Sequence, residues 1–358
     1  MNLYIIRKYL ASFLFTMFLI SMISIVIDFS EKINKFIDAD LSTLDVIKQY
    51  YLPFVPWING LMWPLFSLIA VIFFTSRMAK NTELIAMLSA GVSFNRILVP
   101  YIIAGSILAG LFWLGKNYVI PHANKHKNDF EYAHLTKKHT KTLNNDVHFF
   151  LGEDEKVHIR YYSKRDTSVR GFRIENFKEG KLVKVLKATR LFFKEEPNLW
   201  TIKDYEIRTF EGLEESYVRE TGVELDTVLN LVPADFIRNT KLMENMTTGD
   251  LRDYILREKE RGVGAPKNFL TQLHQRNSEP FSIIILTIIG VAIASRKVRG
   301  GMGLHLAIGV TLGAAFVIVT QFSATFSNNM ALSPAMGAWI PNIVFGAIAL
   351  VLVSFSQK

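Results

Sequence analysis

Six long apolar runs with almost no charged residues constrain the fold of this chain more than any other feature of its sequence. Each run is close to the roughly 20 residues that an α-helix needs to cross the ~30 Å hydrocarbon core of a bilayer. The runs cover about residues 9–27, 54–74, 97–114, 281–294, 304–326 and 338–355. A hydrophobic content of 50% would not by itself separate this chain from a soluble one, but the clustering of the apolar residues does. The sequence therefore predicts six transmembrane helices, three on each side of a long polar region.

Basic residues near the ends of these runs predict how the helices are oriented, because cytoplasmic loops carry an excess of lysine and arginine. The basic residues are Arg7, Lys8, Arg77, Lys80, Arg96, Arg296, Lys297, Arg299 and Lys358. All of them fall on one side of the membrane, so both termini are predicted to be cytoplasmic. The polar region between the third and fourth runs has nearly equal numbers of acidic and basic residues. It is placed on the outer side, which is the periplasm in a bacterium with two membranes.

The polar region is predicted to begin as a β domain. Short stretches rich in β-branched and aromatic residues alternate with polar turn clusters such as Lys178-Glu179-Gly180. The expected strands cover residues 147–151, 157–162, 171–176, 181–193, 199–210 and 217–225. Such evenly spaced strands are typical of an antiparallel sandwich or jelly roll. A helix over 248–261, capped by Thr247 or Thr248, and a short helix over 268–277 then lead into the fourth run.

The sequence lacks the motifs of the common catalytic sites. It has no G-x-x-x-x-G-K-[ST] phosphate loop, and neither H-E-x-x-H nor G-x-S-x-G occurs. His122 and His126 have the i,i+4 spacing of two metal ligands on a helix, with His134 and His139 nearby, but the spacing without a third fixed ligand favours an ordinary polar helix. No run carries a charge at its centre, which argues against an ion pump. We therefore expect no enzyme activity, no metal and no cofactor in this chain.

The loop between the second and third runs contains a short amphipathic helix, predicted over residues 81–91. Asn81 can cap its start, Glu83 then lies in the first turn, and Gly91 can end it. The apolar stripe of this helix consists of Leu84, Ile85, Met87 and Leu88. Such a helix could dock into a groove of a soluble partner, or it could lie in the membrane interface. The spacing alone does not favour either alternative.

Two further pairs of residues leave alternatives open. Gly309 and Gly313 form a G-x-x-x-G spacing in the fifth run, which lets two helices approach closely, and the motif alone favours ordinary packing within the chain. Lys32 and Lys35 follow the first run by about one helical turn. They could form a solvated charged face with acidic neighbours such as Asp28, or they could meet an anionic lipid head group at the outer leaflet.

Four stretches, taken in chain order, are similar to segments of one known family. They are Leu3-Tyr4-Ile5-Ile6-Arg7-Lys8-Tyr9-Leu10, Asn81-Thr82-Glu83-Leu84-Ile85-Ala86-Met87-Leu88-Ser89-Ala90-Gly91-Val92-Ser93, Val119-Ile120-Pro121-His122-Ala123-Asn124, and Leu273-His274-Gln275-Arg276 with Pro280. Together with the layout around a β domain, they make nearly the whole chain resemble the LptF/LptG-type permeases of lipopolysaccharide export, also called the YjgP/YjgQ family. The second stretch is similar to the cytoplasmic coupling helix of that family.

The resemblance implies a transmembrane permease subunit of an ABC transporter that extracts lipopolysaccharide from the inner membrane and passes it to a periplasmic bridge. The implied partners are a cytoplasmic ATPase dimer, a second homologous permease, the periplasmic bridge, a membrane-anchored regulatory protein and lipopolysaccharide itself. By the same resemblance, the ATPase would contact Glu83, Leu84, Met87 and Leu88, lipid phosphates would lie near Lys32 and Lys35, and the lateral gate would include the span of Gly309 and Gly313. Other members can carry a lysine where Asp28 stands. The resemblance does not separate an F-like from a G-like permease.

The expected architecture is thus an α+β membrane protein with six transmembrane helices and a periplasmic antiparallel β-jellyroll domain inserted between helices 3 and 4. The expected division is 1–120 for helices 1–3, 121–267 for the β domain and the helix after it, and 268–358 for helices 4–6. Two alternatives are another ABC-type permease, of the lipoprotein-release or mechanotransmission class, and a membrane sensor with a periplasmic ligand domain. The first usually places its large domain after the first span, and the second needs a cytoplasmic domain that these short loops cannot form.

Overall fold

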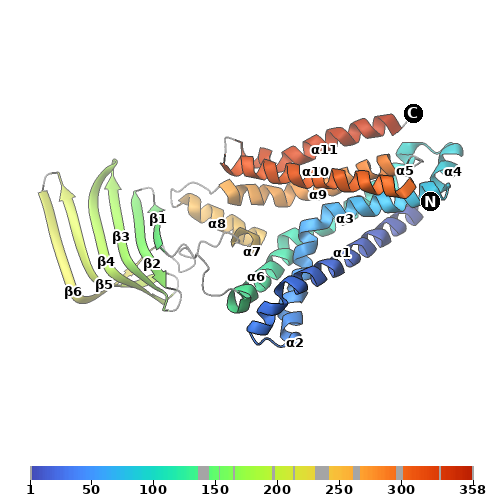
Figure 1. Ribbon diagram of the computed structural model, residues 1–358. Coiled ribbons are helices and arrows are strands. Elements are labelled where there is room, and N and C mark those ends of the chain that lie inside the picture. The colour runs from blue at the N-terminus through green and yellow to red at the C-terminus, as the bar shows by residue number, and fades with distance from the viewer. Residues whose placement is uncertain are drawn as a thin grey trace. The chain divides into compact units, whose positions relative to one another are not determined.

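Helices form both ends of the chain, and one antiparallel sheet forms its middle (Figure 1). The computed structural model describes residues 2–135, 145–152, 154–163, 166–195, 198–212, 214–229, 242–260, 267–295, 301–329 and 332–356. The basic residues Arg296, Lys297, Arg299 and Lys358, and His139, lie outside the described residues.

The described part of the chain contains six helices that are long and apolar enough to cross a membrane, which confirms the predicted six spans. Before the sheet lie α1 (Asn2–Asp38), α2 (Thr43–Asp45), α3 (Leu52–Lys80), α4 (Glu83–Ser89), α5 (Phe94–Leu114) and α6 (Ile120–Phe130), with π-helical turns η1 (Val46–Tyr51), η2 (Gly115–Val119) and η3 (Glu131–Leu135). After it lie α7 (Leu242–Asn245), α8 (Thr248–Glu260), α9 (Lys267–Ala294), α10 (Gly301–Asn329) and α11 (Pro334–Ser356). Several helices contain internal prolines, which membrane helices tolerate when neighbouring groups satisfy the freed backbone.

The prediction of a separate short helix over 268–277 is wrong. The polar residues of that segment and the apolar residues of the fourth run belong to one continuous helix, α9, which has Pro280 in its interior. The apolar pattern ends where charged and amide side chains begin, but the helical backbone does not. Thr271, near the start of α9, is buried and shares a 2.9 Å hydrogen bond with Ser327 of α10, so the polar part of α9 is packed in the bundle.

Helices α3 and α9 lie at the centre of the helix bundle. α1, α9 and α10 pack on α3, while α5 and α11 pack on α9. A Cβ added to Gly290 of α9 would lie 2.4 Å from a methyl carbon of Val71 on α3, so this glycine permits the close approach of the two central helices. The N-terminal end of α1, the short helix α4 and the C-terminal end of α11 lie at one end of the bundle, and α2 and α6 lie at the other (Figure 1).

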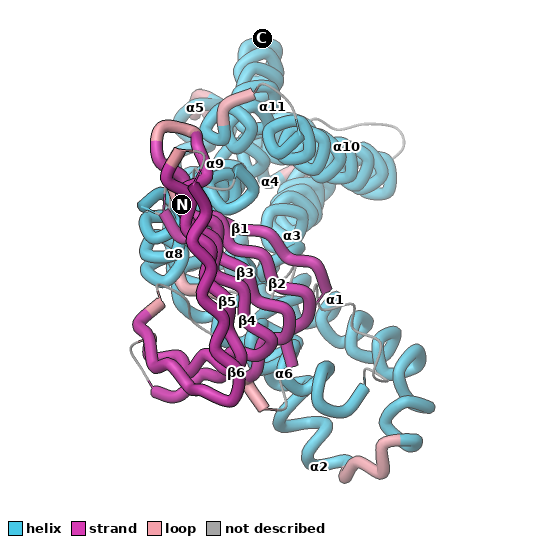
Figure 2. The backbone as a smooth tube through the Cα atoms, turned by 90° about the vertical axis from the view of Figure 1, so that its left-hand side faces the viewer, coloured by secondary structure: helices cyan, strands magenta, loops and turns pink. Residues whose placement is uncertain are grey.

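The six strands form one antiparallel sheet and follow each other in chain order (Figure 2). They are β1 (Asn145–Gly152), β2 (Glu155–Ser163), β3 (Ser168–Lys178), β4 (Lys181–Glu195), β5 (Leu199–Glu211) and β6 (Glu214–Val228). Each predicted strand lies inside one of them, so the inserted antiparallel domain is confirmed. The order is that of a meander, whereas a jelly roll would join its strands by Greek-key connections.

One face of the sheet carries its apolar core. Alternate side chains of β2 to β5 are buried together, among them Val157, Ile159, Phe172, Leu191 and Trp200. The opposite face carries charged and polar side chains, as the period of two along a strand requires. The tight turn between β3 and β4 uses Glu179 and Gly180, both with positive φ, as predicted for the Lys178-Glu179-Gly180 cluster.

The chain forms two compact units. The first comprises residues 1–136, 244–251 and 267–358, and the second comprises residues 137–243 and 252–266. The first therefore contains the helix bundle together with α6 and the short segment that begins α8. The second contains the sheet.

Candidate functional site

The predicted amphipathic helix is present as α4, but it is shorter than the range 81–91 and begins differently. Asn81 does not cap it: Asn81 ends α3, and the residue before α4 is Thr82, whose backbone is left-handed with φ of 63°. The physical reason is that Asn81 and Thr82 form the turn between the two helices, and the left-handed backbone of Thr82 delays the start of α4 until Glu83. Gly91 has φ of 83° and follows the last turn, which confirms it as the end of the helix.

The side chains of α4 divide into an anchoring group and an exposed group. Leu84 is fully buried in the core of the bundle, and Met87 packs against the same core. Ile85 and Leu88 are exposed. Glu83 accepts a hydrogen bond of 3.1 Å from the hydroxyl of Tyr4 on α1. The four site residues expected here are thus brought together, with two of them holding the helix on the bundle.

A cavity of about 530 Å³ adjoins α4 between α1 and α3. Its charged lining consists of Lys8 on α1, Arg77 on α3 and Glu83 on α4. The cavity places both signs of charge beside the exposed side of α4. This end of the bundle therefore offers a polar recess next to two exposed apolar side chains.

The other end of the bundle contains a charged cluster around Lys32. The Lys32 ammonium lies 2.9 Å from a carboxylate oxygen of Asp28, one helical turn earlier, and 2.9 Å from one of Glu131 in η3. It also donates to the hydroxyl of Tyr50, and the hydroxyl of Tyr51 donates to Asp28 over 3.3 Å. Asp28 is therefore an internal partner of Lys32.

Lys35 differs from Lys32, although the sequence places them one turn apart on the same helix. Lys35 is exposed, and no ion pair of Lys35 occurs within the described residues. The structure thus does not bring the two lysines into one site. Of the two lysines, Lys35 is the one whose charge has no ion-pair partner among the described residues.

A second cavity, of about 330 Å³, lies among α3, α6, α9 and α10 near the same end of the bundle. Its lining includes Leu61 and Phe316, and also an ion pair of 2.6 Å between Lys116 and Glu279. Arg276 contributes to the wall as well. A cavity that combines apolar walls with fixed charges suits an amphipathic ligand better than a purely apolar one.

Arg276 is at the centre of a polar network that the sequence interpretation missed. Its side chain is almost completely buried and donates to the hydroxyl oxygen of Thr248 over 3.0 Å and to the carbonyl oxygen of Met246 over 2.8 Å. The hydroxyl of Thr248 also donates to the side-chain oxygen of Asn117. Asn128 donates to Asn245 over 2.8 Å. This network fixes residues 244–251 to η2, α6 and α9.

Two residues of this network lie in sequence stretches that had already been singled out. Asn124, which donates to Glu244 over 3.4 Å, and Arg276 both lie in the stretches that carry the family resemblance. An arginine just before an apolar run normally reads as a surface charge. The sequence did not reveal that residues 244–251 fold back onto it.

Gly309 and Gly313 face α3 within the same chain. A Cβ at Gly309 would lie 2.2 Å from a terminal methyl of Ile72, and one at Gly313 would lie 2.3 Å from a terminal methyl of Leu65. The close approach predicted by the G-x-x-x-G spacing therefore occurs between α10 and α3. His122, one of the histidines considered as a metal ligand, has its Nδ1 2.7 Å from the carbonyl oxygen of Tyr118.

Comparison with known proteins decides the family. Residues 3–354 match the family model described as the lipopolysaccharide export system permease LptF/LptG. The chain belongs to the LptF/LptG family. A search of curated proteins returned no match.

Membership of the LptF/LptG family covers almost every element described above, from α1 to α11. Because the family is one of lipopolysaccharide export permeases, the six apolar helices are those of a multi-pass inner-membrane protein. The chain is therefore a permease subunit. The short α4, the Lys32 cluster and the Arg276 network are thus features of an LptF/LptG permease.

Proposed function

We propose that this LptF/LptG permease is the membrane subunit of an ABC transporter that extracts lipopolysaccharide from the inner membrane and passes it to a periplasmic bridge. A separate cytoplasmic ATPase dimer supplies the hydrolysis, and a second homologous permease completes the pathway. Both termini and α4 lie on the cytoplasmic side, and the sheet lies in the periplasm. Arg7 and Lys8 in the first turns of α1, and Arg77, Lys80 and Arg96 on either side of α4, are basic, as the positive-inside rule requires of that side.

The observation that carries the proposal is the packing of α4 on the helix bundle. Leu84 and Met87 fix the helix on the bundle, so a force applied to its exposed side is transmitted to α3 rather than absorbed by a loose loop. The exposed Leu88 and Ile85 are the apolar contacts that a groove on the ATPase would receive. Glu83, bonded to Tyr4, extends the contact surface toward α1.

The lipid path is proposed along the helices that the chain itself covers least. The apolar windows of α1 and α10 are 11% and 22% buried, against 56% and 61% for those of α3 and α9. α1 and α10 both pack on α3 and leave apolar side chains such as Phe18 and Phe322 exposed. We assign these faces to lipid acyl chains and to the second permease, with α1 and α10 as the walls of the lateral gate.

The head group is proposed to meet the end of the bundle that carries α2 and α6. Lys35 supplies an exposed ammonium there, whereas Lys32 is largely neutralised by Asp28 and Glu131. An exposed lysine near an anionic membrane surface contributes about 1 kcal/mol. Lys35 is therefore the stronger head-group contact of the two.

The proposal is tested by co-purification of the ATPase with the chain. Leu88→Glu places a charge on the exposed side of α4, and we expect it to reduce the amount of bound ATPase about tenfold, a loss of roughly 1.4 kcal/mol. Leu44→Glu, an exposed leucine on α2 at the opposite end of the bundle, is the matched control and should leave the complex intact. Equal ATPase recovery with both variants would remove α4 from the interface.

A further inference from the structure

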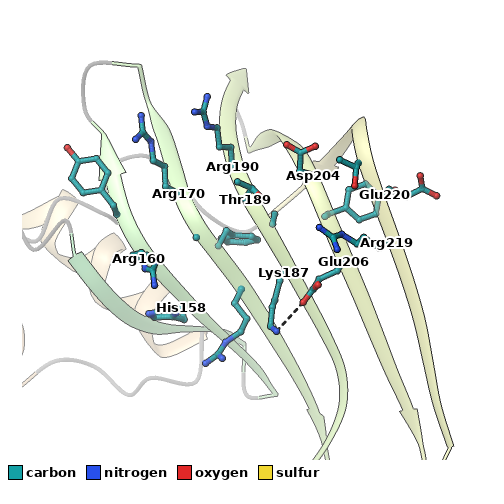
Figure 3. Close-up of a pocket in the computed structure, with 17 residues that line it drawn as sticks. His158, Arg160, Arg170, Lys187, Thr189, Arg190, Asp204, Glu206, Arg219 and Glu220 are labelled. Carbon is teal, nitrogen blue, oxygen red and sulfur yellow. Dashed lines mark ion pairs between the residues drawn. The ribbon is translucent and has the colours of Figure 1, made fainter.

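The polar face of the sheet contains a hollow of about 910 Å³ lined by strands β2 to β6 (Figure 3). Its cationic lining consists of Arg160, Arg170, Arg173, Lys187, Arg190 and Arg219, and its acidic lining consists of Asp204, Glu206 and Glu220. Cations thus outnumber carboxylates by six to three. The hollow lies on the face opposite the apolar core of the sheet.

The charges are distributed unevenly across the hollow. On the β5–β6 side they are matched, because Glu206 is opposite Arg219 in the hollow and Lys203 is opposite Glu224 beside it. On the β3–β4 side they are not: Arg170 is directly opposite Arg190. Like charges directly opposite each other destabilise a sheet. A surface selected only for stability would not place two arginines there.

Most of these arginines also lack an internal partner. Lys187 pairs with Glu206 over 3.1 Å, and Arg173 pairs with Glu175 over 3.1 Å, a residue on its own strand. In the part of the chain that the structure describes, Arg160, Arg170 and Arg190 form no ion pair, and all three are exposed. Figure 3 shows Arg170 and Arg190 side by side on neighbouring strands.

An interruption of the strand pairing shapes the hollow. The pairing of β2 with β3 passes from Ile159↔Phe172 to Tyr161↔Arg170 and omits Gly171, and the β3–β4 and β4–β5 ladders skip the same row. Gly171 has φ of 66°, and a Cβ there would lie 2.8 Å from the Cβ of Arg160. A larger residue at position 171 would therefore clash with Arg160. The unpaired residues at this level of the sheet leave the floor of the hollow open between Arg160 and Arg170. Such irregularities in a sheet re-aim side chains and are enriched near binding sites.

We propose that this hollow binds a phosphorylated saccharide, with Arg160, Arg170 and Arg190 as the contacts for its phosphate groups. Guanidinium groups bind phosphate through paired hydrogen bonds, and three of them over three strands fit a ligand with more than one phosphate. Tyr161, which is exposed and pairs with Arg170, provides an aromatic wall against which a sugar ring packs, and the Glu220 carboxylate accepts from sugar hydroxyls. The carboxylates would repel an acidic peptide, so a saccharide is the better occupant. The volume is in the range of ligand pockets that hold a molecule of this size.

The identification of lipopolysaccharide as the source of this saccharide rests on the proposed function, whereas the anion site itself does not. The test uses calorimetric titration of the full chain in detergent with deacylated lipopolysaccharide, which keeps the phosphorylated saccharide and loses the acyl chains. The same saccharide after enzymatic dephosphorylation, inorganic pyrophosphate and a polyglutamate peptide are the comparison probes. Binding is measured without ATPase, so a failure here is independent of ATPase docking and export.

The decisive variant is Arg170→Gln with Arg190→Gln, and its matched control is Lys178→Gln with Lys181→Gln. The control removes two exposed cations that are also cross-strand partners on β3 and β4, but at the turn and outside the hollow. We expect the arginine variant and dephosphorylation each to weaken binding about tenfold or more at low salt, and the control to change it by less than about twofold.

Three results would overturn the proposal. One is equal affinity of the arginine variant and the control for the phosphorylated saccharide. Another is pyrophosphate binding as tightly as the saccharide, which would reduce the site to one for free phosphate. The third is polyglutamate binding more tightly than the saccharide with the same dependence on Arg170 and Arg190. Unchanged thermal unfolding of both variants shows that the comparison is made on folded protein.

Discussion

Two groups of polar side chains in this permease follow opposite rules. In the helix bundle, Arg276 is buried and donates to Thr248 and to the Met246 carbonyl, so its charge is held by groups of the same chain. On the sheet, Arg170 and Arg190 are exposed, directly opposite each other and without ion pairs in the described part of the chain. Arginine is central to both groups, but the guanidinium of Arg276 has its hydrogen-bond partners within the chain, whereas Arg170 and Arg190 have no ion-pair partner among the described residues.

The difference separates structural charge from charge that awaits a ligand. A buried polar group must be satisfied within the protein, because leaving it unpaired costs the full desolvation penalty. An exposed cation has no such constraint, since water satisfies it until a ligand arrives. Replacing the first kind should therefore destabilise the fold, and replacing the second kind should change binding and leave the fold intact. The predictions below test this separation in order of decreasing effect on stability.

The largest effect is expected for Arg276→Met. The substitution keeps most of the aliphatic volume but leaves the carbonyl of Met246 and the hydroxyl of Thr248 without their donor. We expect a loss of about 2–4 kcal/mol in the free energy of unfolding, measured as a lower denaturation midpoint in detergent. Arg257→Met, at an exposed arginine of α8, is the control and should stay within about 0.5 kcal/mol. A small, equal effect of both substitutions would mean that residues 244–251 are not held by Arg276.

Arg276 also shows where sequence reasoning stopped. The six spans and the six strands could be predicted because each depends on local periodicity, which the sequence displays directly. The partner of Arg276 lies about 28 positions away in the chain, and no local pattern connects Thr248 with residue 276. The same limit applies to the role of Asp28. Asp28 and Glu131 both pair with Lys32, and the sequence does not show that α1 and η3 lie side by side.

An intermediate effect is expected for Lys32→Met. Removal of the ammonium leaves the carboxylates of Asp28 and Glu131 facing the hydroxyl of Tyr50 in a part-buried cluster. We expect a loss of about 1–3 kcal/mol in unfolding free energy. Lys35→Met, one turn further along α1, should change stability by less than about 0.5 kcal/mol. If Lys35→Met proved as destabilising as Lys32→Met, the two lysines would not differ in role.

The sequence predicted the existence of α4 but not which of its side chains face the bundle. The stripe of Leu84, Ile85, Met87 and Leu88 indicated an amphipathic helix, and the helix is there. The stripe could not tell which side chains face the bundle, because that depends on the angle at which the chain leaves α3. The left-handed backbone of Thr82 sets this angle, and it turns Leu84 inward and Leu88 outward.

A smaller effect is expected at the start of α8, where Thr247 and Asp250 cap the helix. The Thr247 hydroxyl donates to the Asp250 carboxylate over 2.7 Å and accepts from the Asp250 backbone N–H over 3.3 Å. Thr247→Ala should therefore cost about 1 kcal/mol of stability.

The cap also predicts a dependence on pH. The hydrogen bond from Thr247 lowers the pKa of Asp250 below its ordinary value of 3.8. Because the folded-state pKa is the lower one, the stabilisation is fully present above the ordinary value and is lost as the pH falls through the folded-state pKa. Thermal unfolding between pH 6 and acid pH checks this: Asp250→Asn should flatten the acid limb of the profile. An identical acid limb in the parent and the variant would contradict the role of the cap.

The smallest effect on stability is expected for Arg190→Glu, and its sign is opposite to that of the others. The new carboxylate would face Arg170 on β3 and Lys203 on β5, so two like-charged cross-strand pairs become oppositely charged pairs. Opposite charges across strands contribute roughly 0.2–1 kcal/mol, so the free energy of unfolding should rise by about that amount. Binding of the phosphorylated saccharide should fall at the same time, because the carboxylate repels phosphate where the guanidinium attracted it. A substitution that stabilises the fold while it removes binding is the signature of a site maintained at a cost to stability. Chemical denaturation and calorimetric titration of the same preparation measure both quantities, and a destabilised Arg190→Glu variant would place Arg190 with Arg276 among the structural charges.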